Sequence, residues 1–219
     1  MKGLLKNNFL GVIENIKILF PFVAVLGIVL SVTGDASLLH IFSFTIAPIL
    51  SVLAALCLRK ETLSKWHKYK ISLPVKRKTI VQSYYISHLC WCLVGMLTVT
   101  LFMSVTVIGH GNQYFYYGFR DAVTFILGGG VVSVFVASVF YPLYYYLGSE
   151  KIEITAILSL AISIGFLVGI SMIINIVVGD KQISDIEYYM SLLMILGITG
   201  AAFLGSYFLS VYIFQKKEY

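Results

Sequence analysis

The side chains that could carry chemistry are few and lie scattered within long apolar stretches. Three cysteines, Cys57, Cys90 and Cys92, occupy such stretches, as do three histidines, of which His40 and His110 are predicted near the outer face and His88 in the inner third of a span. The Cys90-Trp91-Cys92 spacing is not that of a metal-binding or redox pair. A lone histidine in an apolar helix is more often a hydrogen-bonded packing residue than a proton relay. We therefore expect packing roles for these residues and no metal site.

Sequence patterns of catalytic and nucleotide sites are missing as well. The chain has no HExxH for zinc, no GxSxG for a nucleophilic serine and no GxxxxGK[ST] loop that could hold the phosphates of ATP. Gly128, Gly129 and Gly130 form a triplet, but it lies in an apolar stretch without the following lysine. The triplet predicts close helix packing or a hinge. We expect no catalytic residue and no cofactor in this chain.

The elements that position these residues are predicted to be membrane helices. The 219 residues are 59% hydrophobic and only 12% charged, with a mean hydropathy of +0.91. A water-soluble domain is about a quarter charged, so this composition indicates an all-α, polytopic membrane protein. Six stretches lack Asp, Glu, Lys and Arg: 18–33, 36–58, 79–119, 122–149, 154–179 and 188–215.

Six transmembrane helices follow from these stretches, because a span needs about 20 residues. The long 79–119 stretch is predicted to hold one span, at about 84–108, followed by an interfacial segment at 109–119 that is rich in glycine and tyrosine. No charged side chain falls within the spans, which disfavours a transporter driven by protons or sodium. We interpret 1–219 as a single membrane domain.

The basic residues give an orientation. Of the 16 Lys and Arg residues, only Arg120 and Lys181 fall on the side opposite the termini and the 59–80 loop. Cytoplasmic loops carry an excess of Lys and Arg. The pattern therefore predicts that both termini and the 59–80 loop are cytoplasmic.

The first 17 residues are expected to form an amphipathic interfacial helix. Four apolar side chains share one face of such a helix, with polar ones opposite: Leu5, Phe9, Val12 and Ile16 against Asn7, Glu14 and Asn15. A plain charged anchor is one alternative. A cleaved signal peptide is another, but its removal would leave five spans and spoil the charge alternation.

The 59–80 loop holds half of the basic residues and a second amphipathic pattern. Leu63, Trp66 and either Tyr69 or Lys70 recur at helical spacing, and Pro74 ends the pattern. Tryptophan and tyrosine on a short exposed helix are good anchors for a partner's pocket. The alternative is that the loop only fixes topology and contacts anionic membrane lipid.

The sequence KWHKYKISLPVKRKTIVQSYY, at 65–85, resembles the cytoplasmic loop of the small permease subunits of second-type ATP-binding-cassette exporters. Those subunits carry a K-W-x-x-Y-x-x-x-L-P-x-x-R-K-x-I-V-x-S-K-Y pattern. The matching residues are Lys65, Trp66, Tyr69, Leu73, Pro74, Arg77, Lys78, Ile80, Val81, Ser83 and Tyr85. Tyr84 stands where the pattern has lysine, and the acidic start of the loop is reduced to Glu61.

The resemblance implies a bacterial plasma-membrane permease that pairs with a second permease subunit, identical or different, and with separate ATPase subunits that bind ATP and magnesium. The sequence is similar to the permeases of exporters for phenol-soluble modulins and other amphipathic or antimicrobial peptides. In that family residues 61–70 would form a coupling helix. The implied docking residues are Glu61, Lys65, Trp66, Tyr69, Leu73 and Pro74.

Two other classes stay open from the sequence. One is a membrane scaffold or immunity protein that transports nothing, and the other is a membrane-embedded enzyme or channel. The sequence identifies no substrate-contacting residue, and nothing in it favours a nucleic-acid partner.

Overall fold

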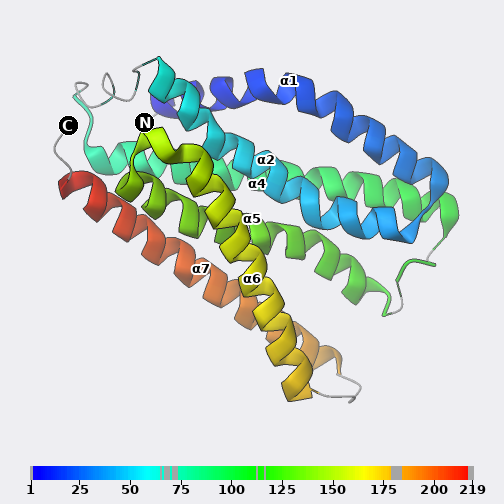
Figure 1. Ribbon diagram of the computed structural model, residues 1–219. Helices are drawn as coiled ribbons and strands as arrows, with labels where there is room; N and C mark the ends of the chain where they lie inside the picture. The colour runs from blue at the N-terminus through cyan, green and yellow to red at the C-terminus, as the bar shows by residue number, and fades with distance from the viewer. Residues whose placement is uncertain are drawn as a thin grey trace.

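A computed structural model describes residues 2–64, 66, 70, 74–111, 113–115, 117–178 and 184–216. These residues form a bundle of long helices (Figure 1). In chain order the elements are α1 (Lys2–Thr33), α2 (Ala36–Leu63), α4 (Arg77–His110), α5 (Phe119–Leu147), the 3-10 helix η1 (Ser149–Lys151), α6 (Ile152–Val178) and α7 (Asp185–Lys216). The protein is an all-α, polytopic membrane protein, as the composition predicts.

The span count agrees with the sequence once α1 is taken as a single crossing. Within the described residues, five helices are long and apolar enough to span a membrane, and a sixth is α1, whose halves Gly3–Glu14 and Leu19–Thr33 meet at 62°. The expected interfacial helix at 1–17 is thus continuous with the first span and separated from it only by the bend. Pro21 lies just after the bend, where its missing N–H and its ring disturb the preceding turn.

The long charge-free stretch divides as expected. Helix α4 ends at His110, and α5 begins at Phe119. Gly111 and Gly118, at the two ends of the intervening segment, have φ angles of 79° and 64°, in the left-handed region that favours glycine. The chain therefore leaves the helix at 111 and re-enters it at 119.

Helix α5 lies in the middle of the bundle and packs against α2, α4, α6 and α7. Its glycines permit close approach: a Cβ on Gly129 would lie 2.6 Å from the carbonyl oxygen of Ser43 in α2, and one on Gly130 would lie 2.8 Å from the sulfur of Met96 in α4. The triplet therefore serves close helix packing, as predicted from the sequence.

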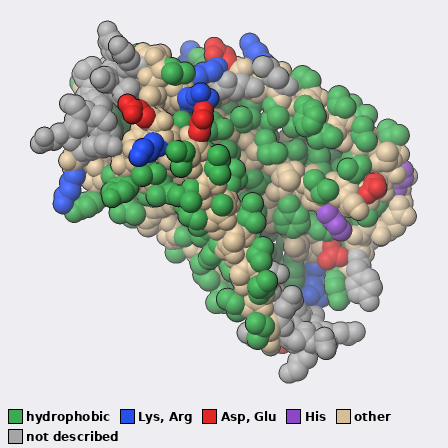
Figure 2. Space-filling view, in the orientation of Figure 1, with side chains coloured by type: hydrophobic (Ala, Val, Ile, Leu, Met, Phe, Trp, Pro, Cys, Tyr) green, Lys and Arg blue, Asp and Glu red, His purple; other side chains and the backbone are tan. Residues whose placement is uncertain are grey.

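The molecule has two ends of different chemistry. We call the basic end the one where α2 ends and α4 begins, with Arg59, Lys60, Lys76 and Lys78; the start of α1 and the end of α7 lie there too (Figure 1). At the opposite end α1 is followed by α2, and α4 by α5. Helix α6 crosses in front of α5, and its far end lies apart from the ends of α1 and α2 (Figure 1). Between the ends, apolar side chains cover much of the visible face, as a lipid-facing surface requires (Figure 2).

Candidate functional site

The candidate docking residues belong to the connection between α2 and α4 at the basic end. Helix α2 ends at Leu63 and is capped by Ser64, whose backbone N–H and hydroxyl both donate to the carbonyl oxygen of Lys60. Trp66 is 36% exposed, and Pro74 is exposed just before α4. Lys65, Tyr69 and Leu73 lie outside the described residues.

Glu61 is placed differently from the expected coupling helix. It lies in the last turn of α2, where only 12% of its side chain is exposed. Arginine, lysine, glutamate and leucine all favour helix, so the segment Arg59-Lys60-Glu61 extends α2 beyond the charge-free stretch. Glu61 therefore lies in helix α2, just before the loop begins.

Lys70 is the most deeply buried charged side chain that the structure describes, at 2% exposure. Its Nζ donates to Glu61 Oε1 at 2.5 Å, to the hydroxyl of Tyr84 at 2.8 Å and to Asn8 Oδ1 at 3.3 Å. The Tyr84 hydroxyl in turn donates to Glu61 Oε2 at 2.5 Å. We call Asn8, Glu61, Lys70 and Tyr84 the root cluster. It joins α1, the end of α2, the loop and the start of α4.

The root cluster holds an ion pair that is largely shielded from water. Burial lowers the pKa of the Lys70 ammonium, while the adjacent Glu61 carboxylate acts in the opposite direction and favours the charged form. Removing one partner of such a buried pair leaves an uncompensated charge. The cluster therefore holds the loop firmly against the bundle only while all of its members are present.

Two residues of the cluster had no sequence signal for this role. Asn8 is not among the residues that the helical pattern of the N-terminal segment singled out, and Tyr84 was only a departure from the family pattern. Asn8 also donates to the Ser83 hydroxyl at 3.1 Å, so it contacts the loop and α4 at once. The hydroxyl of Tyr84 serves the Glu61–Lys70 pair, which gives this departure a structural use.

Arg77 ties the start of α4 to the end of α7. Its Nη1 donates to the backbone carbonyl oxygens of Phe214 at 3.1 Å and Gln215 at 3.0 Å. Carbonyl groups in the last turn of a helix lack partners within the helix, and a cation there also interacts favourably with the helix dipole. One side of the loop is therefore bound to α1 and α2, and the other to α7.

The residues singled out first for chemistry lie elsewhere and have packing contacts. His88 is fully buried in α4, and its Nε2 lies 3.0 Å from the carbonyl oxygen of Ser133 in α5. Ser133 also donates to the Ser51 hydroxyl at 2.6 Å, so these polar groups link α2, α4 and α5. Cys57, Cys90 and Cys92 are free thiols. No group of three or more His, Cys, Asp or Glu side chains placed to hold a metal occurs among the described residues.

Comparison with known proteins shows the family to which the chain belongs. No curated protein and no solved structure matches the chain. The model of a family described as "ABC-2 family transporter protein" matches residues 3–215, which is nearly the whole chain. ABC-2 permeases typically work with an ATPase subunit and have no ATPase activity of their own. The chain therefore belongs to the ABC-2 family and is the membrane permease component of an ABC-2 type transporter.

Proposed function

We propose that this chain is a permease subunit that exports amphipathic or antimicrobial peptides across a bacterial plasma membrane. In this proposal 1–219 is one permease domain, both termini face the cytoplasm and the loop binds a separate ATPase that consumes ATP and magnesium. A second permease subunit, identical or different, completes the transporter. The family match makes a scaffold, an immunity protein or an enzyme a poorer account of the chain.

The observation that carries the proposal is the attachment of the loop. In the root cluster Lys70 is buried and Glu61 is only 12% exposed, and Arg77 is bonded to α7. A force applied to the loop would therefore reach α1, α2, α4 and α7 directly. Trp66 lies between these attachments and is partly exposed. That is the arrangement a motor docking on the loop requires.

The docking assignment changes in one respect. Trp66, with Lys65, Tyr69, Leu73 and Pro74, remains proposed to contact the ATPase, whereas Glu61 acts by holding Lys70 and so positions the loop. Large aromatic side chains dominate the energetics of protein interfaces when they are buried in a partner's pocket. Of the two aromatic residues proposed for docking, Trp66 and Tyr69, Trp66 is the one that the structure describes.

The cargo class is supported by the apolar walls. A groove of about 490 Å³ lies between α2 and α6, with Val132 of α5 also in its lining. The groove lining includes Phe44, Pro48, Leu160 and Ile164 and contains no charged side chain. An amphipathic peptide can place its apolar face against such walls, whereas a sugar or an ion would find only the hydroxyl of Thr45 there.

The test is binding of an ATPase subunit that co-purifies with this chain to membrane-inserted variants. Trp66→Ala is expected to weaken association about thirtyfold, which corresponds to about 2 kcal/mol for a buried aromatic anchor. Trp66→Phe should recover much of this loss. Lys78→Gln, at the same end, should bind as the parent does.

Thermal unfolding of each variant separates docking from folding. If Trp66→Ala binds the ATPase normally and supports full ATPase stimulation, the docking role of Trp66 is wrong. If Trp66→Ala unfolds at a lower temperature and Lys78→Gln loses as much binding, the loop acts through general charge or fold. Either result would remove the proposed interface.

A further inference from the structure

An apolar groove with cations at one end lies between α1 and α2. Its volume is about 810 Å³, within the range of about 300 to 1,000 Å³ typical of small-molecule sites. Its apolar walls are Leu19, Phe22, Leu53, Leu56 and Leu63. The groove includes the first turn of α1 after its bend, so α1 and α2 both border it.

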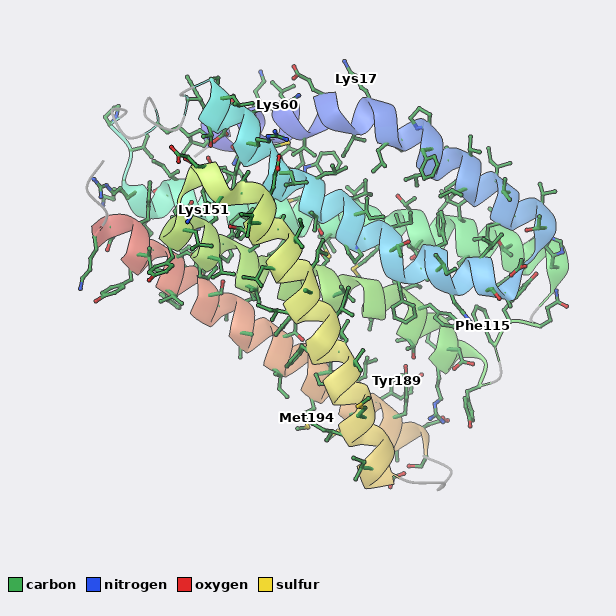
Figure 3. The ribbon with its side chains drawn as sticks, viewed as in Figure 1. Lys17, Lys60, Phe115, Lys151, Tyr189 and Met194 are labelled. Atoms are coloured by element: carbon green, nitrogen blue, oxygen red, sulfur yellow. The ribbon has the colours of Figure 1, made fainter. Side chains whose placement is uncertain are left out.

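The polar part of the groove is confined to the basic end. Arg59 and Lys60 also line it, and Lys60 lies near the end of α2 (Figure 3). Leu53 and Leu56 lie one to two turns earlier on the same helix, about 5 to 10 Å deeper along the helix axis. Apart from Leu63, about one turn beyond Lys60, the apolar lining lies on one side of the two cations, which matches an amphiphile with an anionic head.

The two cations are held by weak contacts that an anion can replace. Arg59 Nη1 lies 2.6 Å from Glu153 Oε1, and Lys60 Nζ lies 3.7 Å from Glu14 Oε2. At least half of each of these four side chains is exposed, and exposed pairs contribute little stability. A guanidinium has five N–H donors in a fork that fits phosphate oxygens, so Arg59 suits a phosphodiester well.

We propose that this groove binds one anionic phospholipid of the surrounding leaflet, with an acyl chain between α1 and α2 and its phosphate at Arg59 and Lys60. The groove opens at the surface, where membrane lipid has direct access. Such a lipid would contact both helices just beyond the bend of α1. It would thereby help to fix the angle between the N-terminal part of α1 and the first span. This inference is independent of the cargo and of the ATPase.

The test uses the full-length chain, purified in detergent and titrated with phosphatidylglycerol or with phosphatidylcholine of the same acyl composition. Native mass spectrometry counts the retained lipids and gives their affinities. The chain should retain one tightly bound phosphatidylglycerol. Arg59→Gln/Lys60→Gln should bind it about twenty-five-fold more weakly, since each cation at a membrane surface contributes about fivefold.

A matched control keeps the overall charge loss but leaves the groove intact. Lys76→Gln/Lys151→Gln removes two cations at the same end that do not line the groove, and its affinity should equal that of the parent. Glu153→Gln removes the competing carboxylate from Arg59 and should increase the affinity severalfold. The loss of any negative charge would also strengthen nonspecific attraction by the basic end, so the increase is assigned to Arg59 only when the Lys76→Gln/Lys151→Gln variant binds as the parent does.

Three results would overturn the proposal. The first is equal retention of phosphatidylcholine, which would show that the head group does not matter. The second is an equal loss of affinity in both double variants, which would show attraction to the basic end as a whole. The third is competition by glycerol phosphate or inorganic phosphate at the concentration that phosphatidylglycerol requires, which would show a free-phosphate site without a role for the apolar walls.

Discussion

Each end of the bundle has an ion pair that joins separate segments, and the two pairs differ in their surroundings. At the basic end Lys70 and Glu61 are 2% and 12% exposed and lie in the root cluster with Tyr84. At the opposite end Arg120 Nη1 donates to Asp185 Oδ1 at 2.9 Å, and Asp185 is 75% exposed. Both partners are therefore shielded from water at the basic end, whereas at the opposite end Arg120 is 14% exposed and only its partner Asp185 is open to solvent.

The difference in exposure indicates which of the two ion pairs the fold needs more. Water and salt screen the charge of the exposed Asp185, and Arg120 keeps its contact with the ring of Tyr188, so the loss of Asp185 changes little. A buried charge has no such compensation, and its pair must stay complete. The basic end is thus built as a rigid junction of α1, α2, α4 and the loop. Under the proposed function, this is the end that receives force from the ATPase.

The largest expected effect comes from removing the buried carboxylate. Glu61→Gln leaves the Lys70 ammonium without its counter-charge and should destabilise the fold by about 3 to 5 kcal/mol. Thermal unfolding of the purified chain in detergent measures this loss. Burial already lowers the pKa of Lys70, and loss of Glu61 lowers it further. The folded state then binds fewer protons than the unfolded state, so the deficit should shrink as the pH rises and grow as it falls.

A double variant tests whether the uncompensated charge is the cause. Glu61→Gln/Lys70→Met removes both charges while retaining an amide near Tyr84, and it should recover at least half of the lost stability. If the double variant is as unstable as Glu61→Gln, or if Glu61→Gln unfolds as the parent does, the root cluster is not the buried junction described above.

An intermediate effect is expected for the tyrosine of the cluster. Tyr84→Phe removes a hydroxyl that accepts from Lys70 and donates to Glu61, but it leaves the ion pair in place. Hydrogen bonds to charged groups contribute about 1.5 to 3 kcal/mol, so a loss of about 2 kcal/mol is expected in the same unfolding assay. Tyr146→Phe is the matched control, because Tyr146 is largely exposed at the same end. Equal stability of the two variants would contradict the assignment.

The sequence predicted the helices better than it predicted their contacts. Charged residues are expensive inside a bilayer, so charge-free stretches located the spans, and the left-handed glycines explain why the chain breaks at 111 and 118. The same rule placed the end of the second span near 58. It could not show that α2 continues to Leu63, because helix propensity persists where hydrophobicity ends.

The contacts of the root cluster could not be predicted from the sequence, for a different reason. Asn8 lies 62 residues before Lys70, and Tyr84 lies 14 residues after it. Periodicity relates residues within one helix and says nothing about which faces of separate helices meet. Lys70 was expected on a docking helix because of its spacing from Trp66. In the structure its charge is instead directed into the bundle.

The smallest expected effect belongs to the opposite end. Asp185→Asn is the counterpart of Glu61→Gln, since each replaces a carboxylate by an amide of the same shape. Arg120 would keep its position over the ring of Tyr188, whose centroid lies 4.6 Å from the guanidinium carbon. The Tyr188 hydroxyl would still donate to the Arg120 carbonyl oxygen at 2.9 Å. Because Asp185 is 75% exposed, water screens its attraction to Arg120, and the expected change is about 1 kcal/mol or less. This change should vanish in about 1 M salt, where the screening length is about 3 Å. Thermal unfolding at low and high salt measures both quantities.

The Glu61→Gln deficit should persist at high salt, because the buried pair is poorly screened. A loss for Asp185→Asn as large as that for Glu61→Gln, or one that salt leaves unchanged, would show that the two ends do not differ in the way their exposure indicates.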